Sequence, residues 1–203
     1  GTVLESKITG WLSIGSTYTY LTALRLEDLI LKKGLNLEIK PISIRNIMKS
    51  MNNIPFPPEK KEKVNYMWRD IERRAAVYGL PSPNLPAPYP LKDFDAANLI
   101  GIVLNNKNLY LKYFNLTYRY WFIEGIEAGS EANIRKCLSE MRQDYTEIME
   151  LAASPHIKDM YENNTLEALG FGVFGAPTFS VGTELFWGDD RLDDAINFMG
   201  KVP

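Results

Sequence analysis

The chain has 203 residues, of which 45% are hydrophobic and 24% charged, and its formal net charge is −2. This composition is typical of a folded globular protein, and it excludes both a disordered chain and a global basic field that would hold nucleic acid or an anionic membrane. The single cysteine, Cys137, excludes an intrachain disulfide. No apolar run reaches the ~18 residues of a membrane helix, and the first residues lack a signal-peptide pattern, so we expect a cytoplasmic protein.

The first segment predicts a strand, a helix and a second strand. Residues 8–14 have the pattern of a strand, and residues 18–33 that of a helix which is apolar on much of its circumference and hence buried against a sheet. Gly34 suits a left-handed helix end, and residues 35–40 alternate strictly between apolar and polar before Pro41. Such a unit normally has parallel strands and a right-handed crossover.

The middle of the chain predicts helices. One apolar face recurs at spacings of three and four, at Val64, Met67, Ile71, Ala75 and Tyr78. Five prolines between residues 81 and 90 predict an extended loop. Helical patterns return over residues 94–108, 111–128 and 131–152, and Ser154-Pro155 is a good start for one more helix. Cys137 has core spacing in the third of these patterns, which indicates an inert thiol.

The last segment predicts a hairpin and a helix. Residues 177–181 and 184–187 flank a Gly182-Thr183 turn, and a helix follows from residue 188. The order of elements predicts an α/β protein with a thioredoxin-like fold and a large all-helical insertion. We expect residues 1–45 plus 169–203 to form the thioredoxin-like domain, and residues 46–168 to form a helical insertion, or lid, domain.

Several kinds of site are excluded or disfavoured. The only histidine, His156, follows a predicted helix cap and is expected at the surface, and no cluster has the spacing of a zinc site. We therefore expect neither a metal nor a Ser-His-Asp triad. Residues 170–175 match G-x-G-x-x-G formally, but they follow a helix and lead into a strand, which is the reverse of the dinucleotide-binding context.

The segment around Ser16 is the first candidate site. A helix that begins just after a strand presents free backbone N–H groups and the positive end of its dipole. Hydroxyls of Ser16, Thr17 and Thr19 can donate hydrogen bonds to an anion there. Alternatively, Ser16 or Thr17 simply caps the helix. The two interpretations are compatible, and the pattern alone leaves both open.

Three motifs carry a resemblance to a known family. Residues 16–21 read Ser-Thr-Tyr-Thr-Tyr-Leu, residues 172–179 read Gly-Val-Phe-Gly-Ala-Pro-Thr-Phe, and residues 184–192 read Glu-Leu-Phe-Trp-Gly-Asp-Asp-Arg-Leu. Lys63, Tyr66-Met67 and Asp70 add a matching helix between them. The chain resembles 2-hydroxychromene-2-carboxylate isomerases and the related kappa-class glutathione transferases, in the DsbA-like branch of the thioredoxin superfamily. The similarity runs through nearly the whole chain.

The resemblance implies glutathione as cofactor. Ser16 would be the catalytic residue, which hydrogen-bonds the glutathione sulfur and holds it as thiolate. Pro177 would be a cis-proline, and Ala176 would pair its backbone with the cysteinyl residue of glutathione. Asp190 would hold the γ-glutamyl end, while Lys63 and Asn53 would face the glycyl carboxylate.

The chain departs from the family motifs at two positions, and the substrate pocket is predicted less firmly than the glutathione site. Thr17 replaces the proline of the family motif, and Asp189 replaces a neutral residue, so that a second carboxylate either repels the γ-glutamyl carboxylate or binds its ammonium group. Four side chains are candidates to line the substrate pocket: Tyr18, Thr19, Trp68 and Trp187. Aromatic residues at such spacings also belong to cores.

Three functions follow as hypotheses. The first is glutathione-dependent isomerisation of a small substrate derived from an aromatic compound, of the 2-hydroxychromene-2-carboxylate type. The second is a kappa-like glutathione transferase or peroxidase. The third is a non-catalytic binding module of DsbA-like fold, in which disulfide exchange is excluded because no Cys-x-x-Cys pair is present. Family resemblance also suggests a homodimer.

Overall fold

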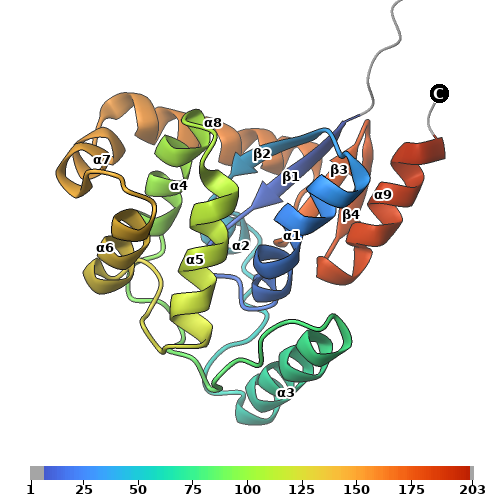
Figure 1. The fold of residues 1–203 in the computed structure, drawn as a ribbon. Helices are drawn as coiled ribbons and strands as arrows, with labels where there is room; N and C mark the ends of the chain where they lie inside the picture. The colour runs from blue at the N-terminus through green and yellow to red at the C-terminus, as the bar shows by residue number, and fades with distance from the viewer. Residues whose placement is uncertain (1–6, 202–203) are drawn as a thin grey trace, which may run out of the picture.

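The computed structural model describes residues 7–201 and has a mixed sheet at its centre. β1 (Ile8–Leu12) pairs in parallel with β2 (Leu37–Pro41) and antiparallel with β3 (Thr178–Val181), which in turn pairs antiparallel with β4 (Glu184–Trp187). Within the described residues, the strand order is β2-β1-β3-β4. Since α1 (Thr19–Lys33) connects β1 to β2, the predicted thioredoxin-like order of elements is confirmed (Figure 1).

Along the chain, a block of helices lies between β2 and β3, as the sequence predicts. It consists of α2 (Ile44–Ser50), α3 (Lys61–Val77), α4 (Ala96–Asn106), α5 (Tyr110–Phe122), α6 (Glu131–Glu140), α7 (Tyr145–Ala152) and α8 (Pro155–Phe171). A 3-10 turn, η1 (Asp189–Arg191), and α9 (Leu192–Lys201) close the chain. α9 packs on β3 and β4, and both α4 and α8 contact β2 (Figure 1). None of the helices in residues 7–201 is long and apolar enough to cross a membrane.

One hydrophobic cluster joins the sheet to the helical block. It contains Leu12 of β1 and Leu21 of α1 together with Phe114, Phe122 and Leu138 of the block, each at most 2% exposed. Apolar burial on this scale is the main favourable term in folding. The division into a domain of residues 1–45 plus 169–203 and a domain of residues 46–168 stays a prediction.

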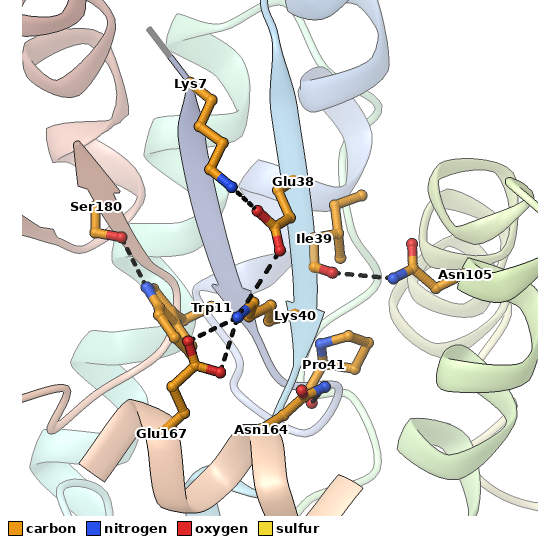
Figure 2. Close-up of polar contacts among 10 residues, drawn as sticks. All are labelled: Lys7, Trp11, Glu38, Ile39, Lys40, Pro41, Asn105, Asn164, Glu167 and Ser180. Atoms are coloured by element: carbon orange, nitrogen blue, oxygen red, sulfur yellow. Dashed lines mark hydrogen bonds and ion pairs between the residues drawn. The ribbon is translucent and has the colours of Figure 1, made fainter. Parts of the chain in front are cut away.

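Hydrogen bonds from side chains fasten the helical block to the outer strand (Figure 2). Asn105 of α4 donates to the Ile39 carbonyl at 2.9 Å, and Asn164 of α8 donates to the Pro41 carbonyl at 3.1 Å. Lys40 reaches Glu167 of α8 at 2.7 Å. The two amide bonds satisfy backbone acceptors of β2, which would otherwise be costly to bury.

The predicted single helix over residues 131–152 is wrong. Arg142 adopts a positive φ of 57°, and the chain forms α6 and α7 in its place. The Asp144 carboxylate accepts the Glu147 N–H at 2.8 Å and so begins α7. The left-handed Arg142 and the cap at Asp144 thus divide a helical pattern that is continuous in the sequence.

One other helix boundary differs from the prediction, and one helix was not predicted. The helix expected over residues 111–128 ends at Phe122, and Gly125 with a φ of 72° turns the chain soon afterwards. The short helix α2 had no sequence signal, but Ser43 begins it by accepting the Asn46 N–H at 3.2 Å. The predicted start of α8 is confirmed, because Ser154 caps it and Pro155 is its first residue.

Candidate active site

Ser16 lies between the end of β1 and the start of α1. Its hydroxyl donates to the carbonyl of Ala176 at 2.9 Å, and its side chain is partly buried. Neither Ser16 nor Thr17 caps α1, because the cap position is Tyr18 and the Thr17 hydroxyl is bonded to Met67 sulfur at 2.9 Å. The capping interpretation is therefore wrong. The helix start has no side-chain cap within the described residues and can serve a ligand.

Two residues of the helical block hold the backbone around Ser16. The Asn98 amide accepts the Ile14 N–H at 2.8 Å and donates to the Ile14 carbonyl at 3.0 Å. The Tyr118 hydroxyl donates to the Ser16 carbonyl at 2.6 Å and accepts the Gly15 N–H at 3.3 Å. Burial raises the pKa of Tyr118, so that this hydroxyl keeps its proton. Sequence reasoning missed both residues.

The loop before β3 lies opposite Ser16. The Ala176-Pro177 peptide bond is cis, as the resemblance implies. The Pro177 carbonyl accepts the Gly188 N–H at 2.8 Å, which joins this loop to the turn that carries Asp190. A Cβ added to Gly175 would lie 2.3 Å from Nε1 of Trp187, so the indole lies directly over that glycine. Trp187 is nevertheless 56% exposed.

The two aspartates of the η1 turn have different surroundings. Asp189 is only 4% exposed, and it accepts hydrogen bonds from Thr22 at 2.7 Å and from Arg25 at 3.1 Å. Burial raises the pKa of Asp189, and the Arg25 charge opposes that rise. Because its carboxylate faces the core, the prediction that Asp189 faces a ligand is corrected. Asp190 is exposed and stays a candidate.

Lys63 and Asn53 lie on exposed segments around the start of α3. The Lys63 ammonium is 5.2 Å from the centre of the Phe56 ring, and that ring is 6.0 Å from the ring of Tyr18. Lys63 is thus connected to the Ser16 loop through two aromatic side chains. Asn53 follows α2, where its N–H bonds to the Met48 carbonyl at 2.9 Å.

The four predicted pocket residues separate into two pairs. Thr19 is completely buried and Trp68 is 7% exposed, with its ring edge-on to Phe122 at 5.7 Å, so both belong to the core. The pocket prediction is wrong for them. Tyr18 is partly buried and donates to Asp70 at 2.7 Å, and Trp187 is exposed. Only this second pair can meet a substrate.

The two other reactive groups, Cys137 and His156, form no hydrogen bond with Ser16 within residues 7–201. Cys137 is completely buried in α6, and burial raises the pKa of its thiol to about 12. It stays protonated at neutral pH and is a core residue, as predicted, while His156 is exposed.

A cavity of about 460 Å³ lies between α2, α4 and α8, and Ser16, Lys63 and Ala176 are not among the described residues that line it.

Comparison with known proteins identifies the family of the chain. A family model described as a DSBA-like thioredoxin domain matches residues 7–199. A protein of Sphingobium xenophagum named 2-hydroxychromene-2-carboxylate isomerase is 30% identical over 181 residues, which cover 88% of this chain and 90% of the relative. A protein of the same name from Pseudomonas putida is 26% identical, over 92% of this chain and 91% of its own.

A solved structure of 2-hydroxychromene-2-carboxylate isomerase has the same fold. It superposes with a TM-score of 0.80 at 23% identity, over 96% of this chain and 94% of that one. A structure described as a putative protein disulfide isomerase from Nitrosomonas europaea follows with a TM-score of 0.72. The named relatives support an enzyme of isomerase type. The chain belongs to the DsbA-like thioredoxin family, in the branch that includes proteins named 2-hydroxychromene-2-carboxylate isomerase.

Proposed function

We propose that the protein is a glutathione-dependent isomerase which acts on 2-hydroxychromene-2-carboxylate or a close analogue. The observation that carries the proposal is the Ser16 hydroxyl, which lies just before α1 and 2.9 Å from the Ala176 carbonyl. A hydroxyl donor and a helix start at one point favour an anion such as a thiolate. The names of the relatives supply the substrate class.

The backbone of Ala176 fits an added peptide. Its carbonyl accepts the Ser16 hydroxyl, and its N–H has no hydrogen-bond partner within residues 7–201. An N–H and a C=O of one residue can pair with one residue of a peptide, as an added strand does. When the peptide N–H takes the Ala176 carbonyl, the Ser16 hydroxyl is released to donate to the sulfur.

The two ends of glutathione have candidates of opposite charge. Lys63 is exposed beside Phe56 and suits the glycyl carboxylate, with Asn53 as a neutral donor. Asp190 is exposed beside the Pro177 loop and suits the ammonium group of the γ-glutamyl residue. Charge-assisted hydrogen bonds of this kind are about twice as strong as neutral ones.

Bound glutathione supplies a thiolate that adds reversibly to a conjugated double bond and leaves again after the resulting single bond has rotated, so that no glutathione atom remains in the product. Ser16 stabilises the thiolate before addition and after elimination. Tyr118 keeps the Ser16 backbone in place through its 2.6 Å bond. Of the four predicted pocket residues, Tyr18 and Trp187 are the ones left to contact a planar substrate.

The direct test is to mix the protein with 2-hydroxychromene-2-carboxylate and follow the absorbance with and without glutathione. The proposal predicts interconversion with the ring-opened benzylidenepyruvate, accelerated by both protein and glutathione. Absence of any glutathione-stimulated interconversion would refute the function for this substrate.

A kappa-type glutathione transferase is the second candidate. One relative, from Caenorhabditis elegans, carries the name glutathione s-transferase kappa 2 and is 21% identical over 81% of this chain. Conjugation of 1-chloro-2,4-dinitrobenzene under the same conditions would favour this candidate over the isomerase. A chain that binds no glutathione at millimolar concentration would instead be a binding module. A homodimer and a cytoplasmic location remain part of the proposal.

A further inference from the structure

Arg45 is an exposed cation of α2 whose guanidinium lies over an aromatic ring. Its Cζ is 3.9 Å from the centre of the Phe94 ring. The same ring touches the residue before Ser16, because a Cβ added to Gly15 would lie 3.4 Å from Cδ1 of Phe94. Phe94 therefore has one edge against the Ser16 loop and one face against Arg45.

A second observation places this helix beside the site. Met48 lies one turn after Arg45 on α2, and residues three apart on a helix share a face. Both Met48 and Ala176 pack against one small hydrophobic cluster, formed by Trp11, Ile42, Ile44, Ile47, Ala168 and Val173. Residues of α2 and Ala176, which lies opposite Ser16, thus pack against the same hydrophobic cluster.

Within residues 7–201, Arg45 has no anionic partner. Arg45 forms no ion pair within 4.0 Å and no hydrogen bond there. Asp93 and Asp95, which flank Phe94 in the sequence, form no ion pair with Arg45 there: Asp93 accepts the Asp95 N–H at 3.0 Å, and Asp95 accepts the Tyr161 hydroxyl at 3.1 Å. A cation in the first turn also gains nothing from the helix dipole.

Such a group suits the carboxylate of a conjugated acid. A guanidinium that is stacked on a ring keeps its edge N–H donors free, and their fork matches a carboxylate with two parallel bonds. The Phe94 ring offers an apolar surface beside it for a planar substrate. Lys63, by contrast, lies beside Phe56, whose ring is next to that of Tyr18, and it suits glutathione.

We infer that Arg45 binds the carboxylate of the substrate and, with Phe94, selects conjugated aryl acids over neutral analogues. The inference rests on the proposed function, since it assigns the acid end of the substrate of that same site. Arg45 is then a specificity residue that acts on substrate binding and leaves the ionisation of the bound thiol unchanged.

The test compares an acid with its ester. Benzylidenepyruvate without the ortho hydroxyl cannot close to a chromene, and S-methylglutathione cannot add to it. Calorimetry with both present therefore measures binding alone, for wild type, Arg45→Gln and Arg45→Lys. Lys49→Gln is the matched control, because it removes one charge from an exposed position of the same helix.

We expect Arg45→Gln to weaken binding of the acid by at least about tenfold, Arg45→Lys to have an intermediate effect, and Lys49→Gln to change it by less than about twofold. The methyl ester should bind wild type and Arg45→Gln equally. Equal binding of the acid to both, equal losses for acid and ester, or no binding of the acid to wild type would each overturn the inference.

The isomerase assay separates this inference from the proposed function. A wild type that binds the acid through Arg45 but shows no glutathione-stimulated isomerisation would remove the function and keep the carboxylate site. A wild type that isomerises the chromene carboxylate while Arg45→Gln binds the acid normally would keep the function and remove the carboxylate site.

Discussion

The Ser16 hydroxyl has one proton to donate and two acceptors to choose between. In the structure it donates to the Ala176 carbonyl at 2.9 Å. A thiolate beside it would be the stronger acceptor, because hydrogen bonds to charged groups are roughly twice as strong as neutral ones. The exchange costs little when a peptide N–H replaces the hydroxyl at Ala176, since no buried polar group then loses its partner.

Cys137 offers a direct check that no protein thiol takes part in the reaction. Burial raises the pKa of this thiol to about 12, and the side chain contacts Thr117 at 3.6 Å in the core. We expect Cys137→Ala to keep the glutathione-dependent rate within about twofold while it lowers the free energy of unfolding by about 1 kcal/mol. Steady-state kinetics and urea denaturation measure both. A loss of rate beyond tenfold with normal folding would contradict the assignment.

For single residues, the sequence predicts which residues belong to a motif better than it predicts where their side chains point. Motifs fix the order of Ser16, Ala176, Pro177 and Asp190 along the chain, and their roles stay predictions. Asp189 was misassigned, since an acidic dipeptide does not reveal which carboxylate meets Arg25 in the core. Two pocket candidates, Thr19 and Trp68, were misassigned for a similar reason. The sequence pattern does not tell which face of a helix packs inward.

Among the elements, α4 and α5 have the less obvious role of supporting the site. Their residues Asn98 and Tyr118 hold the backbone of Ile14, Gly15 and Ser16 across 84 to 103 positions of sequence. A single Asn or Tyr on an apolar helix carries no local signal of such a distant partner. These hydrogen bonds can be identified only from the structure.

Tyr118→Phe tests the support from α5. The change keeps the ring in the core and removes the hydroxyl that bonds Ser16 and Gly15. We expect the free energy of unfolding to fall by about 1–3 kcal/mol and the isomerase rate to fall as Ser16 loses its fixed position. Tyr113→Phe is a suitable control, because the Tyr113 hydroxyl also bonds a buried carbonyl, that of Ala97. A rate lowered equally by both variants would mean that Tyr118 acts through stability alone.

The η1 turn gives a prediction on pH. Because burial raises the pKa of Asp189 in the folded state, the native protein holds this proton more tightly than the unfolded chain does. The free energy of unfolding should therefore fall as pH rises from the ordinary carboxyl range through the raised pKa. Asp189→Asn cannot ionise and should lack this component.

Urea denaturation of both proteins between about pH 4 and pH 7 measures the difference in slope. The account predicts that wild type loses stability relative to Asp189→Asn as pH rises. A gain over the same range would show that the Arg25 charge outweighs burial and lowers the pKa of Asp189. The Arg25 contact is close, at 3.1 Å, so the experiment decides between two opposed effects.

Seen as a whole, the molecule has a thioredoxin-like half and a helical half that share one hydrophobic cluster. We therefore expect a single cooperative unfolding transition. Tryptophan fluorescence and far-ultraviolet circular dichroism should report the same urea midpoint, since Trp11 lies in β1 and Trp121 in α5. Two separate midpoints would mean that the helical residues 46–168 unfold as an independent domain.

The order of elements was predictable from the sequence, whereas their interruptions were not. Strict alternation in residues 35–40 and the hairpin signal at residues 182–183 identify the strands correctly. The break at Arg142 and the short helix α2 depend on one or two polar caps, which tertiary packing selects. Arg45 lies on that unpredicted helix, which is why sequence reasoning did not find it.

The most direct test of the account is the pKa of the glutathione thiol when it is bound to the protein. Thiolate absorbs in the ultraviolet, so a pH titration of the complex reports its ionisation, and Ser16→Ala is the matching variant. The account predicts a bound thiol pKa below that of free glutathione, and a rise of at least about one unit in Ser16→Ala. A bound thiol that ionises as in free solution, or equally in both proteins, would contradict the central role of Ser16.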